Sequence, residues 1–334
     1  MRVRIVLPTF NRASETVAAV ETALAQTFGD FELVVVDDGS TDGTVERLQP
    51  LAARDSRVRL IAAPHAGVAA ARNIAVMAEG GCEYVAFLDA DDRWEPDHLE
   101  RSIELLDCEP DVSLVSGVFV TEDLTGTWTA GEFQARHEKI RRMVTLSARP
   151  SGPDGHVLDP ERTFSAYLRS EVFPYTSTVV VRASCVPDGP WYDGGMVVSS
   201  DSDFYLRLGA TRAPWAFIDR LQCTVRFLGD NLTRSRDLSS PRTLAKQRSV
   251  MTYCTRKLAL CASEGDRRHV RHEVAGQAYL IGQCCDVQGD RPGARAAYCQ
   301  SLRIAPSYAA GRSLVASFLP ERAVNGLKSL LQKA

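Results

Sequence analysis

Three carboxylates, Asp89, Asp91 and Asp92, are the residues of this sequence best suited to chemistry, and they end the stretch YVAFLDADD at 84–92. The apolar run before them predicts a buried strand. Carboxylates this close together repel one another, so a hard cation such as Mg²⁺ or Mn²⁺ would hold them ionised. An Asp-x-Asp motif at the carboxyl end of a strand lies where an open α/β sheet binds its ligand. The alternative is that Asp92 caps a helix over 95–106.

The elements around this motif alternate between strand and helix patterns. Near-continuous apolar runs predict strands at 3–7, 31–36, 58–62 and 84–88, with helices at 14–26 and 68–78 and a further helix ending at 53. Pro8 is expected to end the first strand, and Ser14 is expected to cap the first helix. This alternation predicts a doubly wound, mainly parallel α/β sheet with helices on both faces.

The second half of the sequence is less regular. Short strands are predicted at 112–120, 178–181, 215–218 and 223–227, and Asp159-Pro160 opens a helix. The polar, Gly/Pro/Arg-rich segment 121–155 is expected to be partly loop. From about 241 long helices follow, with a tetratricopeptide-like helix pair at 279–305. We therefore expect a main domain at 1–235 and a helical C-terminal appendage at 236–334, which packs on the main domain or on a partner, with a homodimer as one option.

Composition sets broad limits on function. With 45% hydrophobic and 24% charged residues the chain has the make-up of a soluble protein with a full core, and its net charge of −3 offers no reason to expect nucleic acid. No apolar run reaches the ~18 residues of a membrane span, and the N-terminal run is too short for a signal peptide. We therefore expect a cytoplasmic protein. Cations on the polar face of 321–334 would allow peripheral contact with a membrane, namely Arg322, Lys328 and Lys333.

Nine cysteines are scattered along the chain without CxxC spacing. Reduced thiols in a core are the simplest interpretation. The alternative is a zinc site built from Cys284, Cys285, His269 and His272.

Polar residues follow four of the predicted elements and would meet at one edge of the sheet: Thr9 to Arg12, Asp37 to Ser40, Arg72 with Asn73, and Asp89 to Asp92. Neither GxGxxG nor GxxxxGK[ST] follows a predicted strand, so a phosphate must be held by something other than a glycine cradle. A metal on the Asp-x-Asp motif would serve, because it bridges a diphosphate and neutralises the charge that builds on it as it leaves.

Taken in order, these pieces resemble the inverting glycosyltransferases of family 2, which have the GT-A fold. The resemblance covers about residues 1–230 and rests on IVLPTFNR, ELVVVDDGSTDGT, GVAAARNIA, YVAFLDADD, WYDGG and SSDSDFYLRL. It implies an enzyme of the hexosyl-transferring type. Such an enzyme moves a sugar from a nucleotide diphosphate donor, here expected to be a UDP-sugar, to an acceptor hydroxyl of a glycan, a lipid-linked glycan or a small molecule, with Mg²⁺ or Mn²⁺ as cofactor.

The resemblance also implies residue roles. Asp201 matches the catalytic base, Asp89 and Asp91 match the metal-binding acids, and Trp191 and Tyr192 would contact the acceptor. The donor would be bound by Pro8, Thr9, Phe10, Asp38, Arg72, Asp89, Ala90 and Asp91. The structural alternative for Asp201 is a helix N-cap. Asp203 is expected to be structural, as an acid in the first turn of a helix that interacts favourably with the helix dipole.

Two departures from the family pattern concern the base and the metal. Ser200 stands where a Glu usually precedes the base, and Leu228 stands where many members carry a His. Two other function classes remain open: a sugar-phosphate nucleotidyltransferase, although PTFNRA lacks the Gly-rich basic loop it needs, and a non-catalytic scaffold that uses the C-terminal helices.

Overall fold

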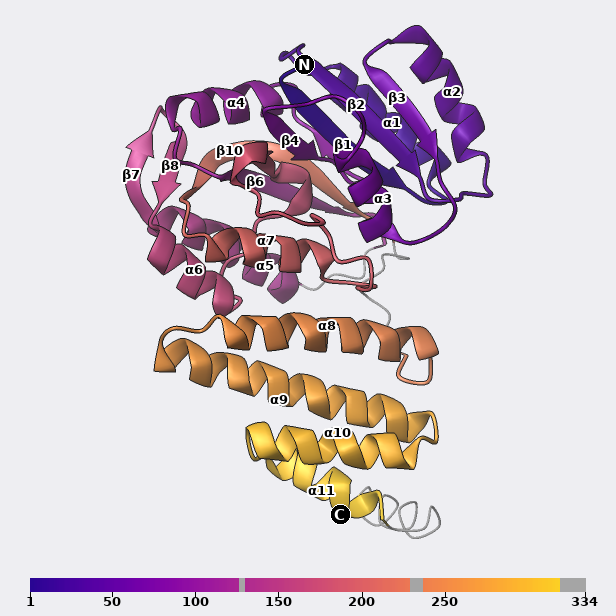
Figure 1. The fold of residues 1–334 in the computed structure, drawn as a ribbon, viewed down its shortest axis with the longest axis vertical. Helices are drawn as coiled ribbons and strands as arrows, with labels where there is room; N and C mark the ends of the chain where they lie inside the picture. Colours follow the sequence, from indigo (N-terminus) through magenta and orange to yellow (C-terminus); the bar gives the residue numbers. More distant parts are fainter. Residues whose placement is uncertain (126–129, 229–236, 319–334) are drawn as a thin grey trace. The chain divides into compact units, whose positions relative to one another are not determined.

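The structure is a computed structural model, and it describes residues 1–125, 130–228 and 237–318. The chain forms two compact units, Met1–Asn231 and Leu232–Ala334. The first is a twisted sheet with helices packed against it, and the second is a set of helices (Figure 1).

Four parallel strands form the N-terminal half of the sheet, in the order β3-β2-β1-β4. All seven residues of β1 are buried, because helices cover both faces of the sheet and apolar side chains therefore suit every position. The elements are β1 (Val3–Thr9), α1 (Ala13–Leu24), β2 (Phe31–Asp37), α2 (Thr44–Arg54), β3 (Val58–Ala62), α3 (Val68–Val76) and β4 (Tyr84–Phe87).

The sheet continues from β4 in the order β9-β6-β10-β8-β7, with β5 paired to β10. Strand β9 is antiparallel to both of its neighbours, while β6 and β10 run parallel. The elements are β5 (Arg93–Trp94), α4 (His98–Cys108), β6 (Leu114–Asp123), α5 (Ala130–Thr145), β7 (Ser147–Ser151), β8 (Gly155–Leu158), α6 (Pro160–Leu168), η1 (Thr176–Thr178), β9 (Val180–Arg182), η2 (Ala183–Cys185), α7 (Ser200–Ala210) and β10 (Trp215–Phe227). The expected α/β fold with C-terminal helices is confirmed.

Two expectations for the first element pair are wrong. Strand β1 continues through Pro8 to Thr9. The Leu88 N–H donates to the Val6 carbonyl, so the backbone N–H and C=O groups of the even-numbered residues of β1 point toward β4. Pro8 lies beyond the end of β4, so the N–H that it lacks has no strand partner to lose. Helix α1 begins at Ala13, which places Ser14 inside the helix rather than at its cap.

The segment expected to be partly loop contains regular structure. Helix α5 occupies Ala130–Thr145, and β7 and β8 form a hairpin beside β10. The two short strands predicted at 215–218 and 223–227 are one strand, β10, with register irregularities between Ile218 and Cys223. A bulge inserts residues without ending a strand, and the sequence shows it only as an interrupted pattern.

The helical unit consists of α8 (Pro241–Ala259), α9 (Glu264–Val287), α10 (Arg291–Ile304) and α11 (Tyr308–Ala316). The predicted helix pair around Gly289-Asp290 is present as the end of α9 and the whole of α10. Ser263, Asp290 and Ser307 cap three helices by accepting a hydrogen bond from the N–H three residues later. Cys284 and Cys285 are buried in the core, and within 237–318 no three His, Cys, Asp or Glu side chains cluster as metal ligands, so the zinc alternative has no support.

Candidate active site

The acidic motif lies just beyond the carboxyl end of β4, where its carboxylates have different surroundings. Asp89 and Asp91 are half-buried, and Asp89 Oδ1 accepts a hydrogen bond from Arg72 Nη2 at 2.6 Å. Asp92 is buried and accepts from Ser177 Oγ at 2.5 Å and from the Arg226 N–H at 3.2 Å. The motif is therefore divided into two half-buried acids and one buried acid that is hydrogen-bonded to η1 and β10.

Asp92 is not a helix cap, as one alternative had it, because β5 intervenes and α4 begins only at His98. Burial raises the pKa of Asp92 well above its ordinary value, and the neighbouring charges of Asp91 and Asp89 raise it further. Its hydrogen bonds with Ser177 and the Arg226 backbone join the motif to η1 and β10.

Arg72, on α3, is buried with its guanidinium directed at Asp89. Its carbon Cζ also lies 5.4 Å from the centre of the Tyr192 ring. Burial lowers the pKa of Arg72, but the charge of Asp89 outweighs this and, with help from Tyr192 and Asp201, holds the pKa above its ordinary value. Arg72, which is expected to bind the donor, is thus paired with an acid of the Asp-x-Asp motif.

A second group of polar side chains surrounds Asp38, at the end of β2. The buried Asp38 carboxylate accepts hydrogen bonds from the N–H groups of Ala66 and Gly67, at 2.7 and 2.9 Å, and its Oδ2 lies 2.8 Å from His65 Nδ1. The His65 ring stacks on Phe10, with centroids 4.3 Å apart and planes 24° from parallel. Phe10 is one of the few exposed large apolar side chains in this unit, so it offers a ring surface at the edge of the sheet.

His65 was not among the residues predicted for this edge of the sheet. A histidine placed just after the third predicted strand, at the same sheet edge as Asp38, was the available signal. Thr9 and Pro8 are in β1, where Thr9 Oγ1 lies 2.7 Å from Thr16 Oγ1, and Ala90 is buried between the two half-buried acids of the motif.

Asp201 lies in the first turn of α7, which starts after Ser199 in a left-handed conformation with φ of 63°. Its Oδ1 accepts from the Ser202 N–H at 2.7 Å, and its Oδ2 accepts from Thr176 Oγ1 at 3.3 Å. Ser199 occupies the cap position, so the cap alternative for Asp201 is wrong. Asp203 is fully buried and paired with Arg207 at 3.2 Å, in the structural role expected of it.

The short helix η1 connects Asp201 to the acidic motif. Thr176 donates to Asp201, while the adjacent Ser177 donates to Asp92 and accepts from the Asp89 N–H at 3.0 Å. Because the two hydroxyls belong to consecutive residues, both acidic groups are anchored to the same short segment. Sequence analysis did not identify this connection.

Trp191 and Tyr192 precede α7 and differ in accessibility. Tyr192 is fully buried, with its ring edge-on to Phe87 at 5.8 Å and its backbone hydrogen-bonded in both directions to the Asn73 side chain. Trp191 is half-buried and stacks on Phe204 at 5.3 Å. Tyr192 therefore has no exposed ring for an acceptor to contact, and it packs against Arg72 instead.

The carboxylates of Asp89 and Asp91 suit a hard divalent cation. Magnesium commonly binds through one or two protein carboxylates, with substrate phosphates and water as its other ligands. In the described part of the chain no three His, Cys, Asp or Glu side chains are placed to hold a metal by themselves. The donor set thus fits a cation held jointly with a diphosphate, and Leu228 adds no ligand.

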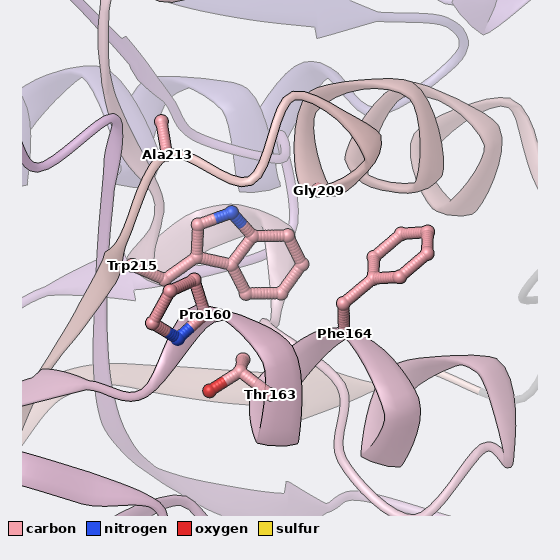
Figure 2. A pocket seen from close by; sticks show the side chains of 6 residues that line it. All are labelled: Pro160, Thr163, Phe164, Gly209, Ala213 and Trp215. Carbon is pink, nitrogen blue, oxygen red and sulfur yellow. The ribbon is translucent and has the colours of Figure 1, made fainter. Parts of the chain in front are cut away.

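A small pocket lies elsewhere, between α6, α7 and the start of β10 (Figure 2). None of its lining side chains is ionisable, and the Phe164 and Trp215 rings dominate it: Pro160, Thr163, Phe164, Gly209, Ala213 and Trp215. It therefore lacks the groups that the chemistry of the acidic motif requires.

Residues 4–171 match the family model described as glycosyl transferase family 2. The chain belongs to this family. The match covers half of the chain and includes β1 to β4, the Asp38 group and the whole acidic motif. The resemblance identified from the ordered motifs is confirmed.

Curated relatives in this family match over a shorter stretch. The putative teichuronic acid biosynthesis glycosyltransferase TuaG of Bacillus subtilis is 37% identical over 105 residues, which are 31% of this chain and 41% of TuaG. Chondroitin synthase of Pasteurella multocida is 41% identical over 102 residues, 30% of this chain and 10% of that protein. The match thus spans less than half the length of each of these relatives.

Solved structures resemble the chain over most of its length. S. aureus TarS 1–349 in complex with UDP-GlcNAc has a TM-score of 0.62 at 14% identity, covering 95% of this chain and 89% of that one. The mannosyltransferase PcManGT from Pyrobaculum calidifontis, in complex with GDP-Man and Mn²⁺, has a TM-score of 0.54 at 18% identity, covering 94% and 78%. At these identities the likeness shows the fold.

Proposed function

We propose that the chain is an inverting glycosyltransferase that moves a sugar from a UDP-sugar to an acceptor hydroxyl. The observation that carries the proposal is the attachment of Asp201 and the acidic motif to adjacent residues of η1. A base and a diphosphate site must lie on opposite sides of one sugar, and a shared anchor holds them at a constant separation.

The nucleoside is assigned to the group around Asp38. Phe10 offers an exposed ring face for a base, and the Asp38 carboxylate is held in place by the N–H groups before α3. The donor-binding set remains Pro8, Thr9, Phe10, Asp38, Arg72, Asp89, Ala90 and Asp91. A neighbour of the same fold solved with UDP-GlcNAc supports a uridine donor.

Asp89 and Asp91 would hold Mg²⁺ or Mn²⁺ together with the donor diphosphate, and a neighbour of the same fold solved with Mn²⁺ supports this assignment. When bound, such a cation neutralises the charge that develops on the departing nucleotide. Arg72 orients Asp89 through its 2.6 Å hydrogen bond.

Asp201 is assigned as the general base. An acceptor hydroxyl is a poor nucleophile until a carboxylate takes its proton, and the oxygen then attacks the anomeric carbon as the nucleotide leaves from the opposite face. Attack from that side inverts the anomeric configuration. The hydrogen bonds from Thr176 and the Ser202 N–H orient the two carboxylate oxygens. Of the two aromatic residues before α7, Trp191 is retained as the acceptor contact.

The Asp201→Asn variant tests the role of the base. We expect transfer to fall by about 10²- to 10⁴-fold, because a general base contributes that much, while UDP binding measured by calorimetry stays unchanged. Asp188→Asn is the matched control, since Asp188 is an exposed aspartate in the same stretch before α7. Full turnover by Asp201→Asn would refute the assignment.

The Asp91→Ala variant tests the metal assignment. We expect it to remove the part of the UDP affinity that depends on Mn²⁺, because one of the two protein ligands is lost. Calorimetric titration of UDP with and without Mn²⁺ measures this directly. Equal affinities in both conditions, for the unaltered chain, would show that no metal takes part.

The helices after residue 236 are proposed to contact a partner, with a second copy of the chain among the options. The cations that suggested contact with a membrane, Arg322, Lys328 and Lys333, lie outside the described residues. None of the described helices is both long and apolar enough to cross a membrane.

A further inference from the structure

The two units of the chain have opposite charges. Leu232–Ala334 contains 17 Lys and Arg against 7 Asp and Glu, whereas Met1–Asn231 contains 22 against 35. The net charge of −3 therefore conceals a helical unit of +10 and a sheet unit of −13. A strong charge difference between parts of a chain points to an interaction surface on the charged part.

Much of the positive charge of the helical unit is not neutralised within it. Six of its arginines are exposed and form no ion pair with any residue that the structure describes: Arg242, Arg248, Arg268, Arg271, Arg303 and Arg312. In the sheet unit, by contrast, most arginines are paired with carboxylates. The helical unit thus presents cations that are free to meet an anionic partner.

Helix α11 and the residues just after it carry exposed apolar side chains. Tyr308, Val315 and Phe318 are 85%, 65% and 62% exposed, which makes them three of the four most exposed large apolar side chains in the described chain. Helical spacing places Tyr308 and Val315 on one side of α11. Leu314 and the buried Ala310 lie on the opposite side, toward the core of the unit.

The exposed side of α11 also carries a cation, and a second arginine lies on the neighbouring helix α10. Arg312 lies between Tyr308 and Val315 on the same side of the helix. The Arg295 guanidinium stacks over the Phe318 ring at 4.1 Å and donates to the Ser317 carbonyl at 2.8 Å. Helix α11 is the last described helix of the unit, beyond α10 (Figure 1). Aromatic, aliphatic and cationic side chains on one outer face are typical of a helix lying in a membrane interface.

We propose that this outer face, formed by Tyr308, Arg312 and Val315 of α11 and extended by the exposed Phe318 just after the helix, rests on an anionic lipid bilayer. The apolar side chains would enter the boundary between headgroups and acyl chains, and the exposed arginines would add electrostatic attraction. A hydrophilic polyanion would satisfy the arginines but leave the apolar side chains in water. A second copy of the chain would bring the same positively charged face against this one, because a two-fold interface pairs a patch with itself.

Vesicle co-sedimentation of the full chain tests this proposal without relying on the donor, metal or base assignments. We expect binding to vesicles of phosphatidylcholine mixed with phosphatidylglycerol, little binding to phosphatidylcholine alone, and release by high salt. Arg312→Gln should weaken binding about fivefold, the effect of one cation near an anionic surface. Val315→Ser should weaken it about tenfold, because its apolar surface no longer enters the interface.

Matched controls come from the sheet unit. Met77→Ser removes an apolar side chain that is 76% exposed, and Arg54→Gln removes an exposed cation, so neither should change vesicle binding. All these side chains are exposed, and unchanged thermal melting would confirm that each variant folds. Binding that is equal for the two vesicle types, or that is unaffected by Arg312→Gln and Val315→Ser, would overturn the proposal. So would binding to dextran sulfate but not to vesicles, or loss of a dimer in Val315→Ser.

Discussion

His98 provides a measurable link between pH and the stability of the sheet unit. It is the first residue of α4, is fully buried, and packs on Trp94 at the end of the acidic segment, with ring centroids 4.6 Å apart. Its Nδ1 lies 2.9 Å from Gln222 Oε1. The Gln222 amide nitrogen donates to two backbone carbonyls, so Oε1 is an acceptor and Nδ1 must carry the hydrogen.

The other ring nitrogen, Nε2, is buried without a hydrogen-bond partner. Protonating it would create a buried cation with an unpaired N–H. Burial accordingly lowers the pKa of His98 to about 4, against the effect of the Gln222 hydrogen bond. The unfolded chain keeps a pKa near ~6.5, so between these values the unfolded state binds more protons than the folded state. This contribution to stability is complete above about pH 6.5 and is lost as the pH falls toward 4.

The linkage relation gives the size of the effect. Each unit of pKa difference corresponds to about 1.36 kcal/mol, so lowering the pH from 7 to 4.5 should remove about 2 to 3 kcal/mol of unfolding free energy through His98. His98→Asn keeps an N–H donor for Gln222 but does not titrate. Between pH 7 and 4.5 the unfolding free energy of the variant should therefore fall by about 2 to 3 kcal/mol less than that of the unaltered chain. At pH 7 itself the variant should be less stable, because its side chain is smaller.

Urea unfolding followed by tryptophan fluorescence measures this difference. All four tryptophans lie in the first unit, so the signal reports the unit that contains His98. Other carboxylates and histidines titrate in both proteins, and their contributions cancel in the comparison. If the unaltered chain and His98→Asn lose the same free energy between pH 7 and 4.5, the argument from the unpartnered Nε2 is wrong.

Two further substitutions test packing near the site and in the helical unit. Gly282→Ala should destabilise the helical unit by about 1 to 3 kcal/mol, because the added Cβ would lie 2.4 Å from the Tyr298 ring. Gly276→Ala, on the same helix, is the control: its Cβ meets no atom within 4 Å, so this variant should be neutral or stabilising. Thermal melting followed by circular dichroism measures both changes. Tyr192→Phe should keep transfer within about twofold, because the buried hydroxyl has no partner, whereas a large rise in the acceptor KM would restore the acceptor-binding role first expected of it.

The first four strands could be predicted because their sequences carry a single, strong signal. A parallel strand buried on both faces is apolar at almost every position, and each such run is followed by a helix that covers it. The later strands pair antiparallel or contain a bulge, so their apolar pattern is interrupted. β10 was therefore predicted as two strands, and the β7–β8 hairpin was not identified.

The candidate site was only partly predictable for a related reason. The acids could be found because each follows a predicted strand or opens a predicted helix, but their contacts depend on residues far away in the sequence. Nothing in the letters around Ser177 indicates a hydrogen bond to Asp92, 85 residues earlier. The charge of the helical unit, in contrast, was present in the sequence and was hidden by summing over the whole chain.

The three motif acids have different surroundings, so one short stretch can both anchor the site to the fold and present carboxylates to a ligand. Asp92 is buried and joins the motif to η1 and β10 through Ser177 and the Arg226 backbone, so a substitution there would disturb the position of both Asp89 and Asp201. Asp89 and Asp91 are only half-buried, and they are the two acids proposed to meet a cation and a diphosphate. Loss of activity in an Asp92 variant would therefore report a displaced site, and the Asp91 variant is the one that isolates the metal.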